Sequence, residues 1–180
     1  SNRMGRGIPA LLTADPTGAR RALVAVLLLG LLAGMACAGQ TADRVLVIKS
    51  KERLYLMHEN EAFASYHVVF GANPKGHKQQ QGDERTPEGH YTLGYKNAHS
   101  DFYKSIHISY PNREDRIRAR ARGVDPGGDI MIHGQANGWE WVAPFSRFFN
   151  WTDGCIALSN RDMDAVWEAV QPGTPIEIRP

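Results

Sequence analysis

Residues 151–158 read Trp-Thr-Asp-Gly-Cys-Ile-Ala-Leu, a short polar turn that leads into a cysteine and an apolar run. The apolar residues from Cys155 onward favour a short buried strand. Glycine immediately before the cysteine lets the backbone approach a ligand closely and leaves amide groups free to face a developing oxyanion. The stretch therefore predicts a nucleophilic cysteine beside a buried strand; an inert cysteine that packs as a small hydrophobic residue is the alternative.

A histidine has a comparable setting upstream. Residues 130–132 (Ile-Met-Ile) predict another short buried strand, and His133-Gly134 follows it directly. A strand end can hold a base rigidly at the surface, and a reactive cysteine needs a base because the thiolate is the nucleophile. His133 and Cys155 are therefore the candidate base and nucleophile, although their order in the chain does not show that they meet.

The segments around these two motifs predict a mainly β domain with minor α structure. Helix is expected at 112–122 and again after Ser159-Asn160, where a polar N-cap precedes two aspartates and an apolar face. Residues 71–89 are rich in turn formers and predict a loop. Alternating or β-branched runs predict strands at 44–49, 53–58, 61–70, 91–95, 104–110 and 175–179.

The N-terminal residues resemble an export signal more than part of this domain. Arg20-Arg21 precede fourteen uncharged residues and the sequence Ala36-Cys37-Ala38, the pattern of a secretory signal peptide. Cleavage after Ala38 would leave residues 39–180 as one domain in the periplasm. An uncut membrane anchor and lipidation at Cys37 are the two alternatives.

Composition excludes several classes of protein. The chain has 180 residues and a net charge of +2, with ordinary aromatic, glycine and proline content, so disorder and nucleic-acid binding are not expected. Residues 39–180 alone hold 17 basic and 18 acidic side chains and one cysteine, Cys155. No disulfide framework follows, and no metal or other cofactor is expected because His133 and Cys155 lack further ligands at suitable spacing.

Four ordered segments resemble the L,D-transpeptidase catalytic domain family (YkuD, or ErfK/YbiS/YcfS/YnhG). The family carries a His-Gly and then, after roughly fifteen to twenty-odd residues, a Gly-Cys followed by an apolar residue. Here His133-Gly134 is followed by twenty residues and then Cys155-Ile156, with Gly154 before the cysteine. The other three segments are residues 82–91, similar to its "GD..TP.G.Y" pattern, 107–112, similar to "isyPN", and 173–178, similar to its closing strand. The resemblance implies a sandwich- or barrel-like β domain.

The resemblance also implies roles for individual residues. Cys155 would attack the amide at the L-centre of diaminopimelate in peptidoglycan stem peptides, His133 would take its proton, and the Gly134 carbonyl would orient the imidazole. The amides of Gly154 and Cys155 would form the oxyanion hole. The remaining candidates for substrate contact are Asp153, Thr152, Trp151 and His107. Asp153 is alternatively a turn residue, and His107 a half-buried, hydrogen-bonded histidine.

The family pattern is not matched everywhere, and this leaves the direction of the chemistry open. Trp151 to Cys155 replace the usual Ser-His-Gly-Cys, and Ala157 replaces a frequent arginine. This variant is similar to a proteobacterial branch that includes an amidase releasing wall-bound lipoprotein. The function expected first is that of an L,D-transpeptidase, as a monomer. The alternatives are a hydrolase, either an L,D-carboxypeptidase or that amidase with wall-linked lipoprotein as partner, and a silent wall-binding module.

Two further stretches suggest contacts with substrate. Residues 139–151 hold six aromatic side chains, which predict either a lid over the site or a small cluster packed for its own sake. Residues 113–122 hold five arginines, which predict either a surface for stem-peptide carboxylates or a solvated helix face.

Overall fold

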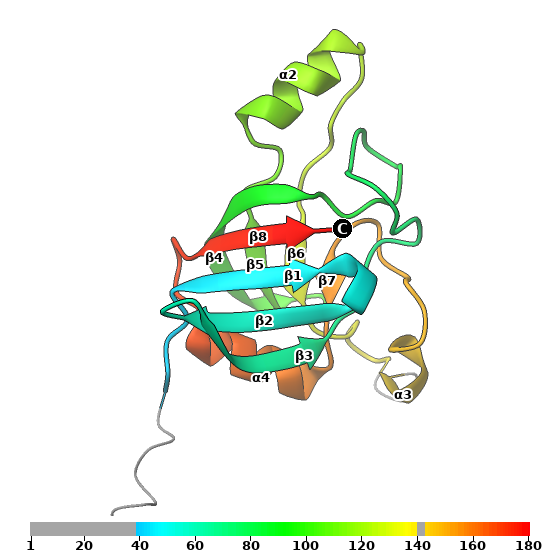
Figure 1. The fold of residues 1–180 in the computed structure, drawn as a ribbon. Helices are drawn as coiled ribbons and strands as arrows, with labels where there is room; N and C mark the ends of the chain where they lie inside the picture. Colours follow the sequence, from blue (N-terminus) through cyan, green and yellow to red (C-terminus); the bar gives the residue numbers. More distant parts are fainter. Residues whose placement is uncertain (1–38, 140–142) are drawn as a thin grey trace, which may run out of the picture. The chain divides into compact units, whose positions relative to one another are not determined.

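Eight strands form a single sheet in the computed structural model, which describes residues 39–139 and 143–180 (Figure 1). The order across the sheet is β3-β2-β1-β8-β4-β5-β6-β7. The signal peptide expected before residue 39 lies outside the described residues. The strands are β1 (Arg44–Ile48), β2 (Arg53–His58), β3 (Glu61–His67), β4 (Gly89–Ser100), β5 (Tyr103–Ile108), β6 (Met131–His133), β7 (Ile156–Ala157) and β8 (Pro175–Arg179).

Alternation of apolar side chains sets the register of the first strands. β1 and β2 form an antiparallel hairpin in which Val45 lies opposite Leu56 and Val47 opposite Leu54, and all four side chains are buried. A one-residue slip would turn this set toward solvent, so the register is strongly specified. β8 lies between β1, to which it is parallel, and β4, to which it is antiparallel.

The sheet is folded over at β4 and partly closed. The first residues of β4 pair with β8 and its later residues with β5, so that β5, β6 and β7 lie behind the front layer (Figure 1). The chain after β3 then reaches β7: Val69 bridges Ala157, and Gly71 bridges Thr152. This contact between the two ends of the strand order gives the domain a barrel-like form and confirms the mainly β expectation.

Helices complete the domain. α2 (Arg113–Ala121) starts at a capping box formed by Asn112 and Asp115 and projects away from the sheet (Figure 1). α4 (Asn160–Ala169) is capped by the Ser159 hydroxyl, contacts β5, and buries an apolar face that includes Met163. The described residues also form the short α3 (Ala143–Ser146) and a single 3₁₀ turn, η1 (Lys49–Lys51). In the described ranges, no helix is long and apolar enough to cross a bilayer.

The sequence placed most elements within a few residues but misjudged some ends. β4 continues to Ser100, beyond the predicted end at Tyr95. The residues after Tyr95 are largely exposed and mostly polar, so they lack the alternation of apolar and polar side chains by which a strand is predicted. β3 ends at His67 instead of Phe70, since the chain there leaves β2 to reach β7. α3 was not expected.

Candidate active site

Strands β6 and β7 bring Cys155 and His133 to one face of the sheet. The strands are parallel, with Ile132 opposite Ile156 and His133 opposite Ala157. Cys155 precedes Ile156, so the alternation of side chains places its thiol on the same face as Ala157 and His133. One strand spacing across and two residues along put the two Cα atoms about 8 Å apart. The predicted nucleophile and base are therefore diagonal neighbours.

The thiol of Cys155 rests against backbone groups at the start of β6. Its Sγ accepts a hydrogen bond from the Met131 amide at 3.4 Å and donates to the Asp129 carbonyl at 3.6 Å. No hydrogen bond joins Cys155 to His133 in the described part of the chain. A rotation about the Cα–Cβ bond is therefore needed before the thiol can reach the base.

The imidazole of His133 is fixed in one tautomer. Its Nδ1 lies 2.7 Å from the Gly134 carbonyl. A carbonyl only accepts, so Nδ1 carries the proton, and Nε2 of the neutral ring is left as the acceptor. The ring is buried between Phe102, at 4.6 Å between centroids, and Trp151, at 5.8 Å. Gly134 thus stands where the resemblance placed the third member of the catalytic group.

Burial keeps both groups neutral at rest. Desolvation lowers the pKa of His133 to about 4, against a smaller opposing effect of the Gly134 carbonyl. Burial also raises the pKa of the Cys155 thiol, an effect that the Met131 amide opposes and the Asp153 carboxylate reinforces. The resting pair is therefore a thiol and a neutral imidazole, the arrangement of general-base activation and not of a preformed ion pair.

The turn before Cys155 is organised by Thr152. Its hydroxyl accepts from the Gly154 amide at 3.2 Å and donates to the Cys155 carbonyl at 2.8 Å. The Gly154 amide is therefore already paired and does not face a ligand, in contrast to the oxyanion role expected for it. No partner of the Cys155 amide is found in the described residues, so this amide remains the candidate oxyanion donor.

The loop between β3 and β4 presses against that turn through glycines. Gly154 has φ +125°, and a Cβ there would lie 2.6 Å from the Arg85 carbonyl oxygen. A Cβ on Gly71 would lie 2.0 Å from the Glu84 carbonyl oxygen and 3.0 Å from Gly154 Cα. Three backbone segments thus meet where no side chain fits, and this explains why a segment seventy residues upstream matters to the site.

Two buried groups hold this loop in place. Lys49 Nζ donates to the carbonyls of Gly76 and Thr86 and to Glu88 Oε1, at 2.8, 3.1 and 2.8 Å. Asp83 pairs with Lys78 and accepts from the amides of residues 79, 80 and 85. The matched "GD..TP.G.Y" segment is therefore held in place by these contacts, and its backbone packs against the turn before Cys155.

The remaining predicted site residues lie at different places around Cys155 and His133. Trp151 packs on His133. Asp153 is exposed and, with Asp129 and Lys78, lines a polar pocket of about 530 Å³ on the Cys155 side. His107 lies opposite Met131 in β5, about 10 Å from Cys155 by strand spacing, and its ring stacks on Tyr95 at 4.9 Å.

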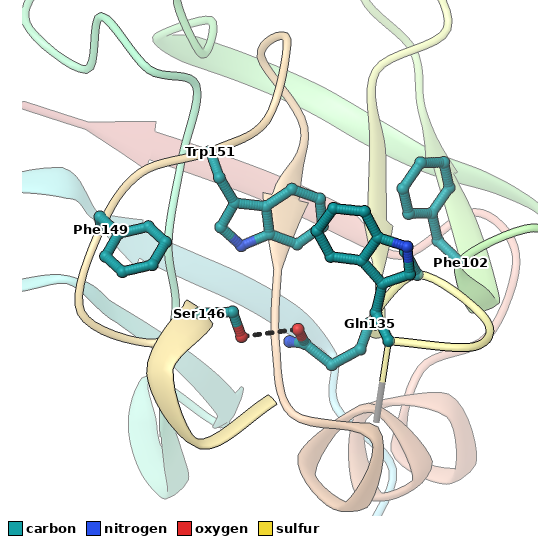
Figure 2. Close-up of a pocket in the computed structure, with 7 residues that line it drawn as sticks. Phe102, Gln135, Ser146, Phe149 and Trp151 are labelled. Carbon is teal, nitrogen blue, oxygen red and sulfur yellow. Dashed lines mark hydrogen bonds between the residues drawn. The ribbon is translucent and has the colours of Figure 1, made fainter. Parts of the chain in front are cut away.

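An aromatic pocket of about 430 Å³ is lined in part by Phe102 and Trp151, the two rings that contact His133 (Figure 2). Phe102, Phe149 and Trp151 form its walls, and its polar groups are paired internally: Ser146 Oγ donates to Gln135 Oε1, and Gln135 Nε2 donates to the Leu158 carbonyl. Trp139, Phe149 and Trp151 line this pocket, but Trp139, Phe145, Phe148 and Phe149 are largely exposed, so the described aromatic side chains of 139–151 form a pocket wall and not a packed cluster of their own. Trp141 lies outside the described residues.

Sequence reasoning missed three contacts of the reactive groups. Met131 and Asp129 touch the thiol through backbone atoms, which no side-chain pattern reveals. Phe102 reaches His133 from the β4–β5 turn, and the only signal was an apolar residue at an otherwise polar turn. No group of three or more His, Cys, Asp or Glu residues within the described ranges is arranged to hold a metal.

This fold is similar to that of proteins with solved structures. The helical cell shape determining protein Pgp2 from Campylobacter jejuni matches with a TM-score of 0.57 at 27% identity, covering 74% of this chain and 46% of that one. An L,D-transpeptidase from Xylanimonas cellulosilytica shares the fold at 14% identity, with a TM-score of 0.50, covering 78% and 62%. The fold is thus that of L,D-transpeptidase domains.

The chain belongs to the YkuD family of L,D-transpeptidase catalytic domains, whose family model matches residues 42–178. The YafK protein of Escherichia coli (strain K12), an L,D-transpeptidase by its name, is 30% identical over 125 residues, which are 64% of this chain and 43% of that protein. The chain therefore spans less than half the length of the curated relatives it matches.

Proposed function

We propose that this chain is an exported cysteine enzyme of peptidoglycan remodelling that transfers acyl groups of stem peptides through a thioester on Cys155. The observation that carries the proposal is the position of Cys155 diagonally across two neighbouring strands from a buried His133, whose tautomer is fixed by the Gly134 carbonyl. Membership of the L,D-transpeptidase family supports the substrate class. The signal-like segment, with processing after Ala38, supports action in the periplasm.

The proposed reaction begins with a proton transfer. Sγ rotates away from the Asp129 carbonyl, and His133 Nε2 takes its proton. The thiolate attacks the amide carbonyl at the L-centre of diaminopimelate, while the Cys155 amide binds the oxyanion. The C–N bond then breaks, and the imidazolium returns the proton to the leaving amine. An incoming amine attacks the thioester in turn and releases the thiol.

The aromatic pocket supports transfer to an amine as the first candidate. Its walls lie against His133, the base that must also activate the second nucleophile, and apolar walls disfavour water there. The polar pocket beside Asp153 supports the second candidate, a hydrolase that acts as L,D-carboxypeptidase or releases wall-linked lipoprotein. The likeness to Pgp2, named for cell shape, supports a role in wall remodelling that affects cell form.

Product analysis separates these candidates. The purified protein is incubated with tetrapeptide muropeptides and with lipoprotein-linked muropeptides, and products are read by mass spectrometry. Exchange of D-alanine or a cross-linked dimer identifies a transferase; tripeptide or free lipoprotein identifies a hydrolase. Cys155→Ala must abolish turnover while folding normally, and turnover by folded Cys155→Ala protein would refute the scheme. Absence of a carbapenem adduct on Cys155 would instead favour a silent binding module.

A further inference from the structure

The five arginines of the segment that contains α2 do two different things. Arg118 contacts Asp115 within the helix and lies 3.3 Å from His77 Nε2 in the loop before β4, and Arg122 hydrogen-bonds Gln79 in the same loop. Asp115 is itself buried and binds the Tyr91 hydroxyl at 3.0 Å. These two arginines therefore hold the helix to the domain.

The other three arginines face solvent together. Arg113, Arg116 and Arg120 make no ion pair or side-chain hydrogen bond within residues 39–139 and 143–180. At about 100° per residue, they fall with the exposed Ile117 on one arc about 100° wide. The buried residues of the helix lie on another side. The helix thus presents a basic stripe that the fold itself does not use.

This stripe opposes the stability of the helix. Arg116 and Arg120 are like charges at i,i+4 spacing, a pairing that costs about 0.2–0.5 kcal/mol. Arg113 lies in the first turn, where the helix dipole disfavours a cation. The dipole favours only Arg120, in the last turn. An anion held between these side chains would convert the repulsion into attraction.

A groove of about 480 Å³ lies beside the stripe. Arg116 and Arg120 line it together with apolar groups of Pro111, Val124 and Pro126. Its walls are tied in place, because the Val124 amide donates to the Ala119 carbonyl at 3.1 Å and the Tyr110 hydroxyl donates to the Pro126 carbonyl at 2.8 Å. The groove is therefore preformed, with two free guanidinium groups and an apolar lining.

We propose that this groove binds carboxylates of peptidoglycan stem peptides and docks the protein on the assembled wall. Guanidinium groups bind carboxylates through two parallel hydrogen bonds, and the apolar lining suits the aliphatic parts of a peptide. A membrane surface fits less well, because Ile117 is the single large apolar side chain exposed on the described residues of α2. The identity of the polymer rests on the proposed function.

Co-sedimentation with isolated peptidoglycan sacculi tests the groove. Arg116→Gln/Arg120→Gln should weaken binding at least tenfold. The control Arg53→Gln/Arg161→Gln changes the charge equally at two exposed arginines elsewhere and should bind within twofold of the parent. Arg116→Lys/Arg120→Lys keeps the charge and the helix but loses the planar fork, so an intermediate affinity is expected. This variant also keeps the test valid if the glutamine variant melts.

The ligand is identified with modified sacculi and competitors. Sacculi whose carboxylates are amidated should lose the parent protein, and free stem tripeptide should displace it better than inorganic phosphate. The proposal would be overturned if Arg116→Gln/Arg120→Gln bound sacculi as well as the control Arg53→Gln/Arg161→Gln does. It would also be overturned if amidation of the sacculi had no effect on binding. Superior displacement by phosphate would overturn it as well, as would arginine-dependent capture by vesicles of anionic lipid in place of sacculi. Turnover of soluble muropeptides is measured in a separate assay. If the protein has no turnover but still binds sacculi through Arg116 and Arg120, the catalytic proposal fails and the binding proposal stands.

Discussion

Replacing Gly154 with alanine tests whether the nucleophile turn is held by close backbone contact. At φ +125° an L-residue is strained, which costs about 1–3 kcal/mol. The new Cβ would also lie 2.6 Å from the Arg85 carbonyl oxygen and 3.2 Å from Ile130 Cδ1, and overpacking of this kind costs about 1–3 kcal/mol. Together the two effects predict a loss of about 2–6 kcal/mol in the free energy of unfolding.

Two other glycines separate these contributions. Gly82 has φ +77° with no atom within 4 Å of a built Cβ, so Gly82→Ala should show the backbone cost alone, about 1 kcal/mol. Gly128 has no positive φ and open space around it, so Gly128→Ala should be neutral or stabilising by up to about 1 kcal/mol. Urea unfolding followed by tryptophan fluorescence gives all three values. A Gly154→Ala loss no larger than that of Gly82→Ala would refute the role assigned to the Arg85 contact.

Three further predictions concern the ionisable groups. Because burial and the Asp153 carboxylate raise the pKa of the Cys155 thiol, iodoacetamide should alkylate Cys155 slowly at neutral pH, and Asp153→Asn should speed the reaction; an unchanged rate in that variant would remove Asp153 from this role. His133 takes up a proton near pH 6.5 in the unfolded state but only near its lowered pKa of about 4 in the folded state. The free energy of unfolding should therefore be highest above pH 6.5 and fall by about 3 kcal/mol toward pH 4, as measured by urea unfolding at each pH. His133→Gln should flatten this decline, and an equal slope in the variant would contradict the assignment. Lys49→Met leaves Glu88 and two carbonyls without their donor and should cost about 2–4 kcal/mol in thermal or urea unfolding, whereas Lys51→Met, at an exposed site, should change little.

The sequence predicted the strands best where apolar side chains follow a pattern that only a buried strand face explains. The alternation in residues 44–58 predicted both strands of the first hairpin, because one face is buried and the other is not. The apolar run before His133 likewise predicted the strand that presents it. The pairing of β6 with β7 could not be read from the sequence, since two- and three-residue strands carry no register information of their own.

The site was predicted in its side chains but not in its backbone. The structure places Cys155 and His133 at neighbouring strands and the Gly134 carbonyl against His133 Nδ1, and their catalytic roles stay a prediction. The contacts of the thiol with backbone atoms of residues 129 and 131, and the pairing of the Gly154 amide with Thr152, depend on local dihedral angles that residue types do not specify. The division of the arginines around α2 into paired and free groups also required the fold, because all five look equivalent in the sequence.

The position of β8 has a consequence for how the chain reaches its folded state. The last strand lies in the middle of the sheet, between β1 from the start of the domain and β4. Until residues 175–179 join the sheet, β1 and β4 each keep an open hydrogen-bonding edge, the feature that promotes misassociation between chains. Folding should therefore be slow and dominated by distant contacts, because the sheet is complete only once residues 175–179 have joined it.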